Sequence, residues 1–241
     1  MKGKRGIALS LMILIGIVFL IIMFFAFAMR GQMVGLIKPK VADISAVQIY
    51  VENCVDAVSQ YAVYKIGKQG GSIQLDEPYF ASPFLDVNYG FNKGKTFPAI
   101  DEAKLEIENF VNENLKNCTA GFRGFGSQGI SVKEGDVRTD VFFGLRSTIV
   151  TVSYPLEITY QDKTFALDKF QRDIPVGLKK IHSKTDEFLN LDRYNLTYLR
   201  GINSNIYIVP FENDDLIVQE SLDSRIYGEN YLFLTAIAQN S

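Results

Sequence analysis

The sequence has few of the residues on which most enzyme and metal sites depend. It contains one histidine, two cysteines and no tryptophan in 241 residues. Two cysteines and a single histidine do not provide the ligand spacing of a zinc site, so we predict no bound metal. One histidine leaves little for acid–base catalysis, and the chain has no Gly-x-Ser-x-Gly motif. We therefore expect a non-enzymatic protein with no catalytic residues and no cofactor.

The chain also lacks a strong excess of charge. It has 25 basic and 27 acidic side chains. Lys2, Lys4, Arg5 and Arg30 flank an N-terminal apolar run, so the remainder has 21 basic and 27 acidic side chains, a net charge of −6. A mildly acidic domain argues against nucleic acid or anionic lipid as its main partner. Twelve tyrosines and 18 phenylalanines without tryptophan suit a core rich in β-strands.

One long apolar run, from Ile7 to Met29, stands out from this composition. Its 23 residues carry no charge. As a helix the run would span roughly 35 Å, enough to cross a hydrocarbon core of ~30 Å with some tilt. We predict a signal anchor in residues 1–30, a juxtamembrane linker in residues 31–40 and an extracytoplasmic domain in residues 41–241. The lipid bilayer is then a partner through residues 7–29.

Two other interpretations of the apolar run stay open. Ala26-Phe27-Ala28 fits the pattern of a signal-peptidase site, although secretory apolar segments are usually shorter. Lys4-Arg5-Gly6 before the run is similar to the leader of archaeal pilin-type proteins, which would be cut before Ile7. Short N-terminal tails ahead of a first helix usually stay in the cytoplasm, so we place the large domain outside.

Apolar periodicity predicts three helical stretches after the linker. Residues 41–66 repeat apolar side chains at three- and four-residue steps, and Gly67, Gly70 and Gly71 then end the helix. Pro98 lies in the expected first turn of a second helix, which Thr119-Ala120-Gly121 ends. Residues 178–200 return to helical spacing. His182 lies there beside three lysines, and we predict that it is a solvated surface residue.

Alternating patterns predict the strands. A short strand is expected at 72–75, and Gly135-Asp136 indicates a hairpin between strands at 129–134 and 137–143. The other expected strands are 148–153, 156–160, 163–167, 170–176, 205–211, 216–222 and 231–238, with turns at Gln161-Asp162 and Asp214-Asp215. The predicted fold class is α+β: a transmembrane helix, then a helix pair packed on a mainly antiparallel, meandering sheet.

The two cysteines, Cys54 and Cys118, each lie on the apolar side or at the end of a predicted helix. In an anchored extracytoplasmic domain an even number of cysteines favours a disulfide, and the alternative is two separate buried thiols. Asn117-Cys118-Thr119 and Asn195-Leu196-Thr197 fit the N-glycosylation pattern, so Asn117 and Asn195 are possible acceptors.

Two further patterns suggest a site but have ordinary explanations. Gly124-Phe125-Gly126-Ser127-Gln128-Gly129 matches G-x-G-x-x-G, but a helix precedes it and a strand follows, the reverse of the dinucleotide-binding order. We interpret it as a helix-to-strand turn with Phe122 and Phe125 in the core. Asp168, Asp173 and Asp186 could flank a sugar, although their spacing is equally that of an ordinary surface.

Several ordered segments resemble a family of archaeal membrane-anchored proteins without an assigned activity. The segments are Tyr50-Val51-Glu52-Asn53-Cys54, residues 66–71, residues 107–118, Ser153-Tyr154-Pro155-Leu156 and Ile174-Pro175-Val176. The resemblance covers residues 47–181 and implies an anchored, extracytoplasmic domain with paired cysteines. It implies no catalytic residues.

These observations favour a single-pass, membrane-anchored cell-surface or envelope protein with a non-enzymatic binding or assembly role. Its partners would be the bilayer, other envelope proteins or further copies of itself. The alternatives are a type IV pilin-like filament subunit and an anchored extracytoplasmic glycan hydrolase.

Overall fold

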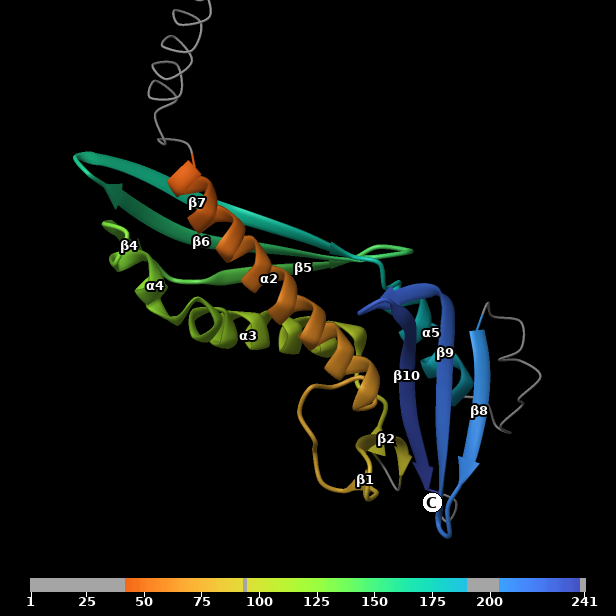
Figure 1. Ribbon diagram of the computed structural model, residues 1–241. Helices are drawn as coiled ribbons and strands as arrows, with labels where there is room; N and C mark the ends of the chain where they lie inside the picture. Colours follow the sequence, from red (N-terminus) through yellow and green to blue (C-terminus); the bar gives the residue numbers. More distant parts are fainter. Residues whose placement is uncertain (1–41, 93–94, 190–203, 239–241) are drawn as a thin grey trace, which may run out of the picture. The chain divides into compact units, whose positions relative to one another are not determined.

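The computed structural model describes residues 42–92, 95–189 and 204–238 (Figure 1). The chain divides into two compact units, Met1–Ser45 and Ala46–Ser241, and nearly all described residues belong to the second. The anchor expected at residues 7–29 and the linker expected at 31–40 lie outside the described residues. Within the described part, no helix is long and apolar enough to cross a membrane.

The described part has the expected α+β class. Its helices are α2 (Ala42–Lys68), α3 (Ile100–Thr119), α4 (Arg123–Gly126) and α5 (Leu178–Leu189), with a short 3-10 turn, η1 (Ala120–Phe122). Its strands are β1 (Tyr79–Ala81), β2 (Asp86–Asn92), β3 (Lys95–Thr96), β4 (Ile130–Glu134), β5 (Arg138–Phe143), β6 (Thr148–Tyr160), β7 (Lys163–Ile174), β8 (Ser204–Pro210), β9 (Asp214–Ile226) and β10 (Glu229–Ala238). The strands form two sheets, where the sequence suggested one.

Helix α2 begins and ends close to where the periodicity predicts. Its buried side chains recur along one stripe, from Val47 to Ile66. After Lys68 the chain turns into the left-handed region, with φ of +78° at Gly70. The Gly71 N–H donates to the Ile66 carbonyl at 2.8 Å, which satisfies a carbonyl at the end of the helix. The predicted glycine stop is confirmed.

The disulfide joins α2 to α3. The Sγ atoms of Cys54 and Cys118 lie 2.15 Å apart, and their Cα atoms lie 5.7 Å apart. This pair fits the predicted disulfide. Next to it, the Tyr50 hydroxyl donates to the Cys118 carbonyl at 3.1 Å, and the Tyr50 ring packs edge-on against Phe125 with centroids 5.4 Å apart. Together these contacts attach the middle of α2 to the end of α3.

Residues 72–75 do not form the expected strand. Their backbone groups bond to a helix side chain instead of a neighbouring strand, because Glu106 of α3 accepts from the Ile73 and Gln74 N–H groups and from the Ser72 hydroxyl. The strands of this region come later, as β1, β2 and β3.

The smaller sheet is built around β6. Strands β4 and β5 pair with β6 along one edge and β7 pairs with its other edge, and all these pairs are antiparallel. Helix α3 lies against β5, where Glu108 accepts from the Val141 N–H at 2.9 Å. The expected turn at Gln161-Asp162 is confirmed between β6 and β7, and Gln161 has a φ of +53°.

The predicted hairpin at Gly135-Asp136 is wrong. Strand β5 pairs with the first half of β6 and β4 with its second half, so β4 and β5 follow one another along the same edge of β6. The interruption lies opposite Pro155, whose carbonyl accepts from the Gly135 N–H at 2.8 Å. The register of β6 with β7 also shifts between Ser153 and Leu156. The two residues therefore form an irregularity within one edge rather than a reversal of the chain.

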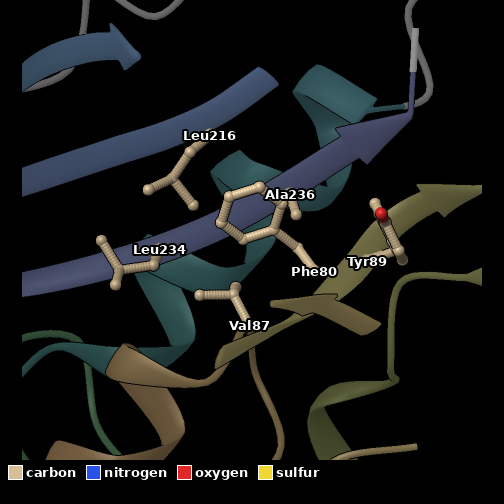
Figure 2. Packing of buried hydrophobic residues seen from close by; sticks show 6 residues of the cluster. All are labelled: Phe80, Val87, Tyr89, Leu216, Leu234 and Ala236. Carbon is tan, nitrogen blue, oxygen red and sulfur yellow. The ribbon is translucent and has the colours of Figure 1, made fainter. Parts of the chain in front are cut away.

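The larger sheet has the order β1-β2-β10-β9-β8, with β3 beside β2. The β2–β10 pair is parallel and the other pairs are antiparallel. One face carries a buried apolar cluster in which the Phe80 ring lies over side chains of β2, β9 and β10, as Figure 2 shows: Val87, Tyr89, Leu216, Leu234 and Ala236. The opposite face packs against Phe188 and Leu189 of α5.

The disulfide generates a stability prediction. Cys54 and Cys118 are 64 residues apart, and closing such a loop stabilises by about 4 kcal/mol in the chain-entropy model. Cys54→Ser and Cys118→Ser should each lower the free energy of unfolding by similar amounts, and the double variant by little more, because both changes remove the same cross-link. Urea unfolding of the detergent-solubilised full chain checks this. Additive losses, or two thiols that react in the unreduced, denatured protein, would reject the bridge.

Candidate functional site

The most distinctive surface of the described domain is the strand β8, at one edge of the larger sheet. Strand β8 pairs with β9 on one side, and no described strand pairs with its other side. Its seven residues, Ser204-Asn205-Ile206-Tyr207-Ile208-Val209-Pro210, carry no charge. An open strand edge exposes a row of backbone N–H and C=O groups, which is a template for pairing with another chain.

The smaller sheet provides an internal comparison, because its edge strand β7 is heavily charged. The twelve residues of β7 include five charged ones: Lys163, Asp168, Lys169, Arg172 and Asp173. Charged side chains on an edge strand are a common protection against unwanted pairing. The same chain therefore protects the β7 edge and leaves β8 without this protection.

The hydrogen bonds of the β8–β9 turn show which backbone groups face outward. The Phe211 N–H donates to the Asp214 carbonyl at 2.8 Å, and Pro210 is paired with Asp215. Hydrogen-bonded and non-hydrogen-bonded pairs alternate along an antiparallel ladder. The backbone groups of Asn205, Tyr207 and Val209 therefore point toward β9, and those of Ser204, Ile206, Ile208 and Pro210 point away from it. Proline has no N–H, so three N–H groups and four carbonyls face outward.

From Ile206 to Val209 the side chains of β8 are largely apolar on both faces of the sheet. Ile206 packs against the cluster under α5, and the register places Ile208 on the same face, opposite Ile217. Tyr207 and Val209 lie on the other face, opposite Val218 and Leu216. Tyr207, Ile208 and Val209 are 51%, 38% and 40% exposed. These three side chains, together with the outward backbone groups, are called the β8 edge below.

Aromatic side chains extend this apolar surface beyond the end of β8. Phe211 is 39% exposed, and its ring packs edge-on against Phe80 with centroids 4.7 Å apart. Phe80 in turn covers the apolar cluster of the sheet (Figure 2). The turn between β1 and β2 carries Phe84, which is 93% exposed. Surface of this kind is typical of a site that binds another macromolecule.

One carboxylate holds the start of β8 in place. Glu220 of β9 accepts from the Asn230 side chain at 2.8 Å, from the Asn205 side chain at 3.0 Å and from the Tyr207 hydroxyl at 3.4 Å. These hydrogen bonds, that from Asn230 first, favour the charged carboxylate and lower its pKa below the usual value. Glu220 therefore links three strands and fixes the Tyr207 side chain against the sheet.

A hollow of about 340 Å³ lies between the 72–76 loop and the start of α3, and it contains three carboxylates: Asp76, Glu102 and Glu106. Glu106 accepts the hydrogen bonds of the loop described above, with its Oε1 2.6 Å from the Ser72 hydroxyl. Glu102 accepts from the Ala99 N–H at 3.0 Å, which caps α3. Glu102 and Glu106 therefore both bind backbone N–H groups, and a structural role explains them better than a catalytic one.

A second hollow, of about 500 Å³, lies on the smaller sheet at the Pro155 irregularity. Its polar side chains bond mainly to one another and to the sheet. Lys133 lies 3.9 Å from Glu157, and Asp168 accepts from the Ser153 hydroxyl at 3.1 Å. In the first hollow the Ser72 hydroxyl and Glu106 lie within hydrogen-bond reach, but both also bond to the backbone of residues 73 and 74, which fits a structural role.

The fold holds apart two of the three carboxylates considered for a sugar site, Asp168 and Asp173. Asp168 and Asp173 lie five residues apart on β7, which is roughly 16 Å along an extended strand. Paired glycosidase carboxyls lie about 5–10 Å apart. Asp186 belongs to a different element, α5. Among the residues that the structure describes, no group of three or more metal-ligating side chains gathers.

The expectation that His182 is solvated is wrong. It is 5% exposed, and its Nε2 lies 2.7 Å from the Pro98 carbonyl. Its ring packs on Phe97 with centroids 4.5 Å apart. Burial lowers the pKa of His182, against the opposing effect of the Pro98 hydrogen bond. The neighbouring lysines indicate a solvated face, but His182 lies on the inner face of α5 while Lys179 and Lys180 are exposed.

The remaining predicted sites divide between described and undescribed residues. Asn117 is exposed near the end of α3, where its side chain donates to the Glu113 carbonyl at 3.4 Å. Its glycosylation stays a prediction, and Asn195 lies outside the described residues. The G-x-G-x-x-G segment leads into β4, as predicted, and Phe122 is buried while Phe125 is partly buried.

Substitution by proline within β8 tests which backbone N–H groups bond to β9 and which face outward. Ile208 and Val209 have nearly equal exposure, so proline at either position loses a similar side-chain contact. Val209→Pro also removes an N–H bonded to β9 and should cost about 2–3 kcal/mol more than Ile208→Pro, whose N–H faces outward. Urea unfolding measures the difference. Equal losses, or a larger loss for Ile208→Pro, would show that the assignment is reversed.

Comparisons of the chain with family models, curated proteins and solved structures found no match. The resemblance to an archaeal membrane-anchored family therefore stays a prediction.

Proposed function

We propose that this chain is a single-pass, membrane-anchored surface protein with a binding or assembly role, and that it binds through the β8 edge. The observation that carries the proposal is the uncharged edge strand, with its outward N–H and C=O groups, in a domain whose other long edge strand is charged. Proteins that bind by strand addition use such an edge: the backbone hydrogen bonds give affinity, and the alternate side chains give specificity.

The membrane part of the proposal rests on the sequence. Residues 7–29 are uncharged, long enough to span a bilayer and flanked by basic residues. The disulfide between Cys54 and Cys118 supports an extracytoplasmic domain, since disulfides persist in oxidising compartments. Anchoring holds the domain at one membrane face, where a partner strand presented on the same membrane meets it at high effective concentration.

A filament subunit of the pilin type is the second candidate. The observation in its favour is Lys4-Arg5-Gly6 directly before the apolar run. In that case residues 1–6 would be removed and the mature chain would begin at Ile7. The N-terminal residue of the mature protein separates the two candidates.

The anchor is tested by extraction of membranes at alkaline pH. The full chain should remain in the membrane pellet, because an apolar span of this length is held by the hydrocarbon core. A variant without residues 7–29 serves as the control and should be released. Recovery of the full-length protein in the supernatant, or of a shortened chain that begins at Met29, would contradict the anchor.

The β8 edge is tested by the size of the complex that chemical cross-linking captures from the full chain in membranes, with Ile208→Pro as the variant. Wild type should be captured in the membrane as a complex larger than one chain, and Ile208→Pro as a single chain, because proline deletes an outward N–H at the centre of the edge. Tyr227→Ala is the control, since Tyr227 is 55% exposed on the β9–β10 turn, and it should keep the complex. A complex that Ile208→Pro leaves intact would reject binding through β8.

A further inference from the structure

The β8 edge has a chemistry that fits a copy of itself. We infer that β8 pairs antiparallel with β8 of a second copy, about a two-fold axis that passes at Tyr207, so that the larger sheets of the two copies become one. The inference rests on the proposed function, and it names the occupant that the proposal leaves open.

The outward backbone groups of two β8 strands match in this arrangement. If Tyr207 lies opposite Tyr207 of the second copy, Ile206 lies opposite Ile208, and Ser204 lies opposite Pro210. All four of these residues direct their backbone groups outward, as the β8–β9 register requires. Proline lacks only an N–H, so its carbonyl still accepts from Ser204. This register forms about six backbone hydrogen bonds and makes the Tyr207 pair a non-hydrogen-bonded one.

Pairing of β8 with its own copy also brings no like charges together within the strand. A two-fold axis brings like residues together, so any charged residue near the centre of the strand would face its own copy. Strand β8 has none, and the nearest carboxylate, Glu220, is held by Asn230 and Asn205 on the neighbouring strands.

The partly exposed apolar side chains of the two copies would also come together. Residues directly opposite in an antiparallel pair lie on the same face. The two Tyr207 rings would then meet on the face that carries Phe80, where each Val209 would lie opposite Asn205 of the other copy. The Ile206 and Ile208 side chains would meet on the α5 face. The side chains that β8 leaves partly exposed in one copy are those that the second copy would cover.

The area that the two strands bury determines whether the copies pair in dilute solution or only on the membrane. One strand pair buries less than the ~1,200–2,000 Å² of stable interfaces, so the free domain should pair weakly in dilute solution. On a membrane, anchoring raises the effective concentration of the second copy. We therefore expect dimers in the membrane that dissociate when the chain is extracted and diluted.

The test is disulfide cross-linking in membranes that contain the full chain. Cβ atoms of a directly opposed, non-hydrogen-bonded pair lie about 4.5–5.5 Å apart, close to the range that a disulfide needs. Tyr207→Cys should give a covalent dimer with diamide as the oxidant, several-fold more than the matched control Tyr227→Cys, whose exposure is 55% against 51%. Adding Ile208→Pro to Tyr207→Cys should remove the excess. Peptide mass mapping checks that Cys54–Cys118 stays intact.

A mixture of two other cysteine variants tests the register of the pairing. It also keeps the inference testable if Tyr207→Cys does not fold. Asn205→Cys and Val209→Cys lie opposite one another in the proposed pairing, so the mixture should cross-link more than either variant alone. Equal yields for Tyr207→Cys and Tyr227→Cys, with no gain in the mixture, would overturn self-pairing. If self-pairing fails but the wild type still forms a complex that Ile208→Pro abolishes, a different strand occupies the edge and the proposed function stands. If no such complex forms, both fail.

Discussion

The close approach of α2 to β10 is the contact on which the position of the β8 edge depends. Tyr231 of β10 is buried, and its hydroxyl donates to the Val63 carbonyl at 2.8 Å. Burial raises the pKa of this phenol far above its usual value, so it stays a donor. One turn later, a Cβ on Gly67 would lie 2.5 Å from the Leu232 carbonyl oxygen, so only glycine allows this contact. Helix α2 thereby fixes β10, which pairs with β9, which pairs with β8.

The same helix attaches to the smaller sheet. Asp56 accepts from the Arg172 guanidinium of β7 at 2.6 Å, and Cys54 is bonded to α3. A second connection comes from β9, whose register with β10 shifts so that Leu222, Asp223 and Ser224 have no partner on β10. Ser224 accepts from the Gly177 N–H at 3.2 Å, and Asp223 pairs with Lys180 at 2.9 Å. The irregularity in β9 therefore holds the connection between β7 and α5.

The sequence predicts the elements better than their partners. Helical periodicity, the glycines after α2 and the even number of cysteines are local signals, and they gave α2, α3 and the pairing of Cys54 with Cys118. The edge position of β8 is not local. A strand becomes an edge because of what pairs with its neighbour, and the parallel β2–β10 pair joins segments that are far apart in the chain.

The misses have physical causes of the same kind. Gly135-Asp136 has turn composition, but the Pro155 carbonyl takes the Gly135 N–H and keeps β4 and β5 on one edge. The lysines around His182 indicate a solvated face, but the histidine itself lies on the buried side of α5. The sequence signal for the candidate site was that residues 204–210 carry no charge whereas residues 163–174 carry five charged side chains. That contrast has meaning only once both strands are known to lie at edges.

Residue-resolved amide exchange of the full chain in membranes tests the central claim, that the β8 edge is engaged there. In chains extracted and diluted in detergent, the Ile206 and Ile208 N–H groups should exchange fast while those of Tyr207 and Val209, which bond to β9, stay protected. In membranes all four should be protected. Fast exchange at Ile206 and Ile208 in both states would show that the edge is free, and it would contradict the account.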